Sequence, residues 1–258
     1  MSFNNQRVVI TGGAGGIGSL LCQDFARQGA NVTVIDRVEH IDVAAEVSLL
    51  QADLGSMEGI QKVCADIAEQ QVDILINLAG VQYFGLFEEQ SPEQVLLHYM
   101  VNLVAPAMLT QSVLPSMKAL GRGHIVNVGS TFASINFAHF VTYSSSKAGL
   151  KGFSEALRRE VAADGIQVTY VAPRAVKTAL NNEMVMQLAA AIKMNMDSPE
   201  YVAAKIMQAI SARKKEHFIG FPESLFVRVN ALLPRIVDQA LAANDKKART
   251  IIKQTEVV

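Results

Sequence analysis

The chain has 258 residues, half of them hydrophobic, with 23 lysines and arginines against 24 aspartates and glutamates. This length and composition indicate a globular protein with a sizeable core and exclude a disordered chain. A net charge of −1 without long runs of one sign argues against a nucleic-acid partner, and two isolated cysteines, Cys22 and Cys64, indicate neither a disulfide framework nor a metal site.

From the N-terminus onward, short apolar runs alternate with longer helical patterns. The opening segment lacks the layout of a signal peptide and no stretch reaches 18 apolar residues, so we expect a cytoplasmic protein. Nearly continuous apolar runs are typical of strands that are buried on both faces of a parallel sheet. Such runs occur at 7–11, 31–36, 47–51, 72–80, 124–130 and 166–173, with a last one at 217–221. Helical spacing occurs at 17–28, 56–70, 91–120 and 142–165.

This alternation predicts an α/β fold. Strand–helix repeats give right-handed crossovers and a doubly wound parallel sheet, which is Rossmann-like and has three αβα layers. We expect one domain over residues 1–221, followed by a C-terminal helical extension over 222–258.

The first strand runs into a glycine-rich turn, TGGAGGIG, at residues 11–18. A turn that joins a strand to a helix N-terminus can bind a pyrophosphate on its backbone N–H groups, provided that side chains stay clear. Two glycine frames fit the pattern, Gly12/Gly16/Gly18 and Gly13/Gly15/Gly18. A turn that only serves tight packing is the alternative reading.

Asp36 ends the second strand, 18 residues after Gly18. A carboxylate at this place can accept hydrogen bonds from an adenosine ribose and would repel a 2′-phosphate, which favours NAD over NADP. The neighbouring Arg37 leaves NADP possible, because an arginine can accommodate that phosphate.

Tyr143 and Lys147 are one helical turn apart in TYSSSKAGL. This spacing places both side chains on one helix face. Either the pair is structural, or the lysine ammonium favours the phenolate and lowers the pKa of the tyrosine for catalysis. The spacing alone does not decide between these readings.

Taken together, these motifs resemble the classical short-chain dehydrogenases/reductases over about residues 5–220. TGGAGGIG fits that family's cofactor turn, Asn77 to Gly80 resembles its strand-end motif, and Pro173 to Thr178 resembles its segment beside the nicotinamide. The family's catalytic tetrad is matched in order by Asn102, Ser130, Tyr143 and Lys147. The cofactor-binding residues that the resemblance implies are Thr11, Gly12, Gly13, Gly16, Ile17, Gly18, Asp36, Arg37, Asp53, Leu54, Asn77, Ala79, Gly80, Tyr143, Lys147, Pro173, Val176 and Thr178.

The resemblance implies an NAD(P)-dependent oxidoreductase that interconverts a hydroxyl and a carbonyl group by hydride transfer. Tyr143 would be the general acid/base, and Lys147 would lower its pKa and hold the nicotinamide ribose. Ser130 would orient the substrate oxygen, and Asn102 would hold a water that relays protons to Lys147. A regulator that senses the dinucleotide without turnover, or a scaffold at a membrane surface, is the alternative.

Two positions depart from the family pattern. Leu78 replaces a second asparagine at the strand end, and Arg174 replaces the glycine after Pro173. Arg174 either meets an anionic group of the substrate or pairs with a surface carboxylate.

Several aromatic residues suggest an apolar cleft and a hydrophobic small-molecule substrate. They are Tyr83, Phe84, Phe132, Phe137 and Phe140, and ordinary core positions are the alternative for some of them. A methionine-rich helical segment at 184–196 lies where the family has its substrate lid.

The C-terminal extension carries an apolar stripe that is interrupted at Pro234, where a break is expected. It can pack on its own domain or on a partner subunit, cover the cleft, or contact a membrane surface. The stripe comprises Leu225, Val229, Leu232, Leu233, Ile236, Val237 and Ala240.

The helices at 91–120 and 142–163 offer apolar surface for a four-helix bundle between subunits, so we expect a homodimer or homotetramer. The residues expected in that bundle are Ala105, Ala107, Met108, Leu109, Val113, Ala148, Leu150, Phe153, Ala156 and Leu157.

Overall fold

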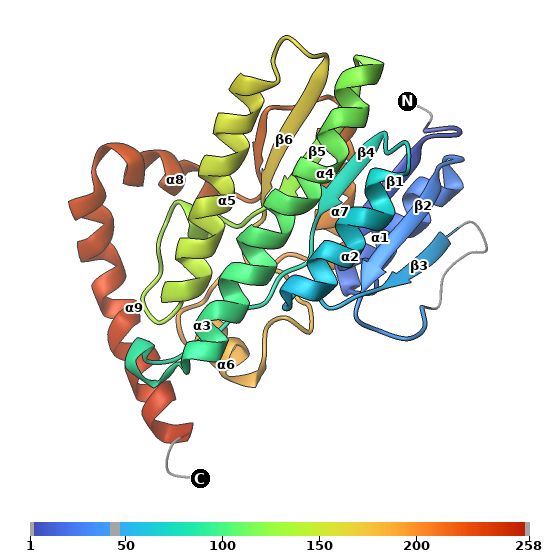
Figure 1. Cartoon of the computed structure of the whole chain (residues 1–258). Helices are drawn as coiled ribbons and strands as arrows, with labels where there is room; N and C mark the ends of the chain where they lie inside the picture. Colours follow the sequence, from blue (N-terminus) through green and yellow to red (C-terminus); the bar gives the residue numbers. More distant parts are fainter. Residues whose placement is uncertain (1–2, 42–46, 256–258) are drawn as a thin grey trace.

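A parallel β-sheet forms the centre of the molecule, and helices cover both of its faces (Figure 1). The computed structural model describes residues 3–41 and 47–255. Within them, seven strands lie in the order β3-β2-β1-β4-β5-β6-β7, and each neighbouring pair is parallel. The strand order reverses between β1 and β4, which is where doubly wound sheets bind their ligands. The strands are β1 (Arg7–Thr11), β2 (Asn31–Asp36), β3 (Val47–Gln51), β4 (Ile74–Asn77), β5 (Gly123–Val128), β6 (Ile166–Ala172) and β7 (Glu216–Phe218).

Alternate residues of each strand face opposite helix layers, because successive side chains in a strand point to opposite faces. Val8 and Ile10 of β1 pack with α1 and α7, whereas Val9 packs with α2, α4 and α5. The expected three-layer αβα arrangement is therefore confirmed. The layer helices are α1 (Gly16–Arg27), α2 (Met57–Ala68), α4 (Ala105–Leu120), α5 (Val141–Glu160) and α7 (Pro199–Ser211).

Two helical regions differ from the expectation. The pattern at 91–120 is divided into α3 (Pro92–Tyr99), a π-helical turn at Met100–Val104, and α4. The helix α7 was not expected at all, although its buried residues recur at helical spacing. Short 3₁₀ turns occur at Phe87–Glu89 and Thr131–Ala133.

The chain after β7 is helical and breaks where expected. α8 (Glu223–Leu232) and α9 (Pro234–Thr255) are separated by the single residue Leu233. Residues 256–258 of the expected extension lie outside the described residues. Together with α6 (Glu183–Ala191), these helices lie at one end of the sheet (Figure 1).

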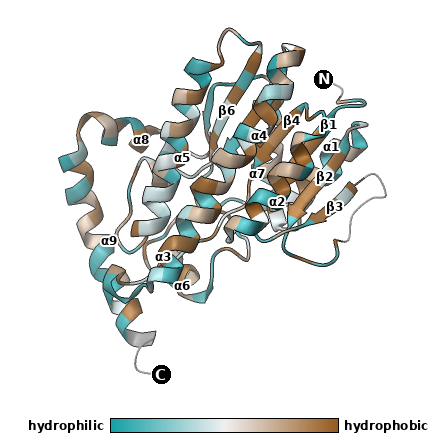
Figure 2. Ribbon diagram, in the orientation of Figure 1, coloured by the Kyte–Doolittle hydropathy of each residue, from teal (hydrophilic) through white to brown (hydrophobic). Residues whose placement is uncertain are grey.

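The residues of the expected apolar stripe do not share one environment. Leu232 is 80% exposed and Ile236 56%, whereas Val227 and Val237 are buried against Ile135. Hydrophobic and hydrophilic residues alternate around the α8–α9 elbow in Figure 2. Helical spacing identifies an amphipathic helix, but the break at Pro234 rotates α9 relative to α8, so one stripe does not continue through both.

Candidate active site

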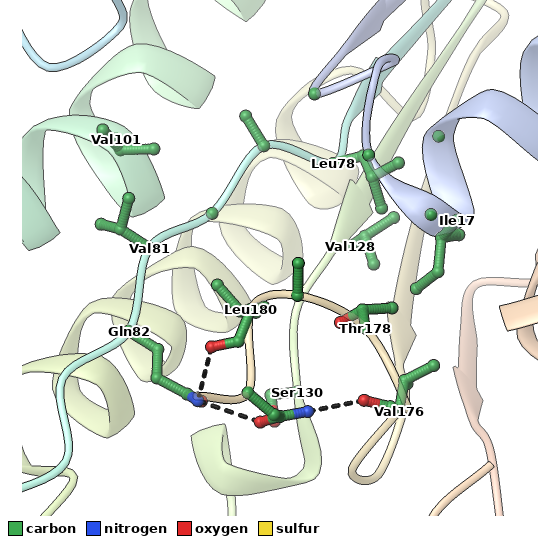
Figure 3. Close-up of a pocket in the computed structure, with 18 of the residues that line it drawn as sticks. Ile17, Leu78, Val81, Gln82, Val101, Val128, Ser130, Val176, Thr178 and Leu180 are labelled. Carbon is green, nitrogen blue, oxygen red and sulfur yellow. Dashed lines mark hydrogen bonds between the residues drawn. The ribbon is translucent and has the colours of Figure 1, made fainter. Parts of the chain in front are cut away.

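A cleft of about 730 Å³ opens at the carboxyl ends of the strands. Its size suits a small-molecule ligand. It is lined from the turns that follow the strands and from α5 and α6, and Figure 3 shows part of this lining. Of the residues that the resemblance implies for cofactor binding, those in the lining are Gly12, Gly16, Ile17, Gly18, Asp36, Arg37, Asp53, Leu54, Ala79, Gly80, Tyr143, Lys147, Pro173, Val176 and Thr178.

The turn after β1 requires glycine at two positions. Gly12 has φ +72°, and a Cβ atom there would lie 2.9 Å from the Cα atom of Ala79. A Cβ atom at Gly18 would overlap the carbonyl oxygen of Gly12. This geometry favours the frame Gly12/Gly16/Gly18, and it brings bare backbone to the N-terminus of α1, where an anion is favoured.

Three of the implied cofactor residues lie behind the lining instead. The Thr11 hydroxyl accepts hydrogen bonds from the backbone N–H groups of Leu78 and Ala79, both at 3.0 Å. A Cβ atom at Gly13 would meet the side chain of Val34, so that glycine serves packing. Asn77 donates to the Asn127 side chain at 2.8 Å and is buried. Of the three, Thr11 holds the turn against the segment that follows β4.

The Asp36 carboxylate is fixed at the edge of the cleft by two backbone N–H groups. It accepts from Ala14 at 3.1 Å and from Arg37 at 2.8 Å. Asp53 accepts from Gly55 at 2.8 Å and so orders the loop after β3, while Ser56 provides the N-cap of α2. Both carboxylates therefore line the cleft from loops of defined shape.

Tyr143, Lys147 and Ser130 face the same cleft. Tyr143 and Lys147 lie in the first two turns of α5, and Ser130 follows β5. The Lys147 ammonium donates to the carbonyl oxygen of Val128 at 3.0 Å, and the Ser130 hydroxyl accepts from the N–H of Phe132 at 3.1 Å. Both polar side chains are thus oriented by backbone groups.

Burial controls the ionisation of this pair. It raises the pKa of Tyr143, and a hydrogen bond with Ser130 acts in the opposite direction. It lowers the pKa of Lys147 to about 8. The lowered tyrosine pKa expected from the neighbouring lysine is not found, because the ammonium is directed to Val128 and the desolvation of the phenol outweighs other effects.

Asn102 lies in the π-helical turn and is fully buried behind the cleft. Its side chain accepts from the Val81 N–H at 3.0 Å and donates to the Val81 carbonyl at 2.9 Å and to Ser146 at 3.0 Å. Both amide hydrogens are used, so the Asn102 side chain joins the segment after β4 to α5.

The aromatic residues expected in the substrate region divide into two sets. Phe132 and Phe140 line the cleft. Phe137 stacks on Phe132 with ring centroids 5.0 Å apart, and Phe84 packs on Phe140 at 4.9 Å. Tyr83 turns back toward the carbonyl of Leu86. Phe137, Phe84 and Tyr83 are not among the lining residues, and the first two pack against the rings that line the cleft.

Arg174 lines the cleft, but carboxylates of the protein occupy its guanidinium. It binds both oxygens of Asp197, at 2.7 and 3.0 Å, and Glu223 at 2.9 Å. These contacts raise the pKa of Arg174 further. The pairing alternative therefore describes the structure, with the difference that Asp197 is only 8% exposed and is not a surface carboxylate.

Two polar residues of the cleft were not expected from the sequence. Gln82 donates from Nε2 to the carbonyl oxygen of Leu180 at 3.1 Å and to the Asn181 side chain at 2.9 Å (Figure 3). Asn181 in turn donates to the Val176 carbonyl at 2.5 Å. The two contacts of Gln82 span almost a hundred positions of the chain, so a local sequence pattern cannot predict them.

Among the described residues, there is neither a metal-binding cluster nor a helix that could span a membrane. Among residues 3–41 and 47–255, no cluster of three or more histidine, cysteine, aspartate or glutamate side chains has a metal-binding arrangement. Nor does any helix in these ranges combine the length and the apolar character that crossing a membrane requires.

Comparison with known proteins assigns the chain to a family. A family model described as short chain dehydrogenase matches residues 6–189. The D-xylose 1-dehydrogenase of Caulobacter vibrioides is 37% identical over 186 residues, which cover 69% of this chain and 74% of that protein.

Solved structures agree with this match. A putative NAD(P)-dependent gluconate 5-dehydrogenase from Beutenbergia cavernae, with bound NADP, is 26% identical at a TM-score of 0.74, covering 84% of this chain and 95% of its own. A short-chain dehydrogenase from Sphingobium yanoikuyae, in complex with NADPH, is 25% identical at a TM-score of 0.76. The match covers 92% of this chain and 95% of that protein. Since the family model covers well over half of the sequence, including the glycine turn, Tyr143 and Lys147, the chain belongs to the short-chain dehydrogenase family.

Proposed function

We propose that the protein is an NAD(P)-dependent oxidoreductase that interconverts a hydroxyl and a carbonyl group. One observation carries this proposal: Tyr143, Lys147 and Ser130 line the same cleft as the glycine turn and Asp36. A dinucleotide on the turn and a substrate at the tyrosine would then share one cavity. The membership of the chain in the short-chain dehydrogenase family supports the same reaction class.

Tyr143 is the proposed acid/base. Its raised pKa keeps the phenol protonated near neutral pH, which suits it to protonate the oxygen of a carbonyl that is being reduced. Ser130, at the end of β5, orients that oxygen. In the oxidation direction the base is the deprotonated form of Tyr143, whose phenolate oxygen removes the hydroxyl proton, so oxidation is favoured by higher pH.

The residues around the cleft fit a dinucleotide. The bare backbone from Gly12 to Gly18 at the start of α1 suits a pyrophosphate, and the fixed Asp36 carboxylate suits ribose hydroxyls. When bound, the nicotinamide supplies or accepts the hydride. Lys147 is the proposed partner of its ribose.

We propose NAD as the preferred cofactor, because the Asp36 carboxylate would repel a 2′-phosphate and is held in place by Ala14. The preference depends on this residue. The two solved relatives described above carry NADP and NADPH.

The substrate wall favours a small molecule with an apolar side. Phe132, Phe140, Val185 and Met194 line this part of the cleft, and Gln82 adds a polar group. The Arg174 guanidinium is paired within the protein, so an anionic substrate is not favoured. Polyhydroxylated substrates are also tested, because one relative of this chain is a D-xylose 1-dehydrogenase.

A substrate panel tests this function. NADH oxidation is followed with hydrophobic ketones, and NAD reduction with the matching alcohols and with D-xylose. Turnover that is lost in Tyr143→Phe supports the proposal. Binding of NADH without turnover of any substrate class would support a dinucleotide-sensing regulator instead.

We also propose a homodimer or homotetramer built on α4 and α5. Half of the residues expected at that interface are buried in the protein's own core, namely Ala105, Leu109, Val113, Leu150 and Leu157. The surface left for a partner is therefore smaller than the sequence suggested and comprises Ala107, Met108, Ala148, Phe153 and Ala156. Sedimentation as a monomer at micromolar concentration would contradict this assembly.

The domain division stays a proposal, with residues 1–221 as the oxidoreductase domain and 222–258 as an extension packed on it. The contact of Val227 and Val237 with Ile135 supports that packing. A cytoplasmic location remains a prediction from the sequence.

A further inference from the structure

The second half of α9 lies directly behind the substrate wall. Three buried residues of this helix, Ala248, Ile251 and Ile252, pack in one hydrophobic cluster with Val185 and Leu188 of α6. The same cluster contains Phe84, Phe140 and Tyr143. Val185, Phe140 and Tyr143 line the cleft, whereas no described lining residue belongs to α9. The helix therefore touches the wall from outside and can act only through it.

Lys247 ties α9 to the C-terminal end of α6. Its ammonium donates to the carbonyl oxygen of Ala191, the last residue of α6, at 2.9 Å. The last carbonyls of a helix have no partner within the helix and carry a partial negative charge, so a lysine is favourable there. This contact restrains the C-terminal end of α6.

Asp245 ties α9 to the opposite side of the wall. Its carboxylate binds Nε2 of His139 at 2.8 Å. His139 is 7% exposed, has φ +67°, and immediately precedes Phe140. Asp245 also pairs with Arg249, one turn further along α9, at 3.1 Å. A movement of α9 would therefore act on Phe140 through its neighbour.

We propose that Lys247 and Asp245 are positioning residues that make α9 the outer layer of the substrate pocket. By holding α6 and the loop at 137–140 together, α9 keeps Val185 and Phe140 at the wall and sets the length of substrate that fits. The favoured class is a short ketone or secondary alcohol whose apolar part ends against these two side chains. This inference rests on the proposed function for its substrate class.

The packing of α9 explains why its contacts should affect the part of the cleft that binds the substrate. Asp36 and the glycine turn, which form the proposed pyrophosphate and ribose end of the cofactor site, do not belong to the cluster that contains Ile251; of the implied cofactor residues, the cluster contains Tyr143. Loosening α9 should therefore change substrate binding and leave the cofactor KM unchanged.

The test uses Lys247→Ala and Asp245→Asn in the full chain. Lys247→Arg, which keeps the donor, is the rescue variant, and Lys246→Ala is the matched control at an exposed neighbouring position. kcat and KM are measured for a series of methyl ketones of increasing chain length at saturating NADH. Hydrogen exchange of the amides of residues 183–191 is measured in parallel, without substrate.

Lys247→Ala and Asp245→Asn should each raise KM for the shortest good ketone about three- to tenfold, the equivalent of one net hydrogen bond. Relative to the shortest good ketone, kcat/KM for the longer ketones should rise. Both variants should keep kcat within about twofold of the wild-type value, and amide hydrogen exchange in α6 should be faster. Lys247→Arg should restore both readouts, and Lys246→Ala should change neither.

Unchanged KM ratios together with unchanged exchange in both variants would overturn the inference. The exchange measurement keeps the two proposals separable, because it needs no turnover. Faster exchange in α6 without turnover of any substrate would support the contact between α9 and α6 and refute the proposed reaction.

Discussion

Lys147 directs its ammonium to the carbonyl oxygen of Val128, 3.0 Å away, at the end of β5. This bond places the cation beside the strand end instead of on the phenol of Tyr143, one turn earlier. The two residues are thus linked through the cleft that they line together, and the ionisation of each is dominated by its own burial. Their pH dependences should be separable in experiments.

The charge of Lys147 predicts a pH profile. Burial lowers its pKa to about 8, so the side chain is charged below that pH and neutral above it. If the charge assists turnover, kcat/KM for carbonyl reduction should fall as the pH rises through about 8. Lys147→Met, which has no charge to lose, should be less active at pH 6 and should lack this inflection. A flat wild-type profile from pH 6 to pH 10 would contradict the role given to Lys147.

Removal of the Tyr143 hydroxyl tests the proton transfer. Tyr143→Phe should lower kcat by about 100-fold or more, the usual contribution of general acid–base catalysis. The ring and its packing remain, so NADH binding measured by fluorescence should be unchanged. Tyr83→Phe is the control, since Tyr83 is outside the lining. Retention of more than about a tenth of the wild-type kcat in Tyr143→Phe would refute the mechanism.

Asp36→Ala tests cofactor selection. Loss of the carboxylate removes its repulsion of a 2′-phosphate, so the ratio of KM for NADPH to KM for NADH should fall about tenfold, equivalent to 1.4 kcal/mol. Glu39→Ala, which removes an exposed carboxylate three residues along, should leave the ratio unchanged. A wild-type protein that already binds NADPH more tightly than NADH would show that the assignment of Asp36 is wrong.

His124 predicts a loss of stability in acid. Burial lowers its pKa from 6.5 to about 4, with a smaller effect of Arg213 in the same direction. Its Nε2 lies 2.8 Å from the hydroxyl of Thr169. Between pH 6.5 and pH 4 the unfolded chain binds the proton and the folded chain does not, so stability falls as the pH falls through this window. The maximum effect is about 3 kcal/mol.

Urea unfolding at pH 7, 5.5 and 4.5 measures this contribution. His124→Gln should reduce the difference in unfolding free energy between pH 7 and pH 4.5. The exposed His40 provides the matched control, and His40→Gln should keep the wild-type difference. Equal differences in both variants would assign the acid sensitivity to other groups.

Local patterns could predict the core of the cleft. The glycine turn, Asp36 at a strand end and the spacing of Tyr143 and Lys147 depend on neighbours in the sequence, and the structure brings them to one cavity. The strands could also be predicted from local sequence, because strands that are buried on both faces form nearly continuous apolar runs.

Contacts between distant segments could not be predicted in this way. The Gln82–Asn181 contact and the pairing of Arg174 with Glu223 depend on which loops meet across the sheet. Asn102 was placed in the site by resemblance, but its use of the Val81 backbone follows from a π-helical turn that the spacing does not indicate. The exposed position of Leu232 reflects the bend at Pro234.

The presence of Ile252 in one hydrophobic cluster with Phe84 and Phe140 has a consequence for the order of folding. Synthesis delivers α9 after every strand of the sheet, so a growing chain can pair β1 to β7 and form the glycine turn while the rear of the substrate wall still lacks its cover. Contacts over such long sequence separations form late, because the closure of a long loop must precede them. A nascent chain should therefore acquire the capacity to bind a dinucleotide before it can discriminate between substrates.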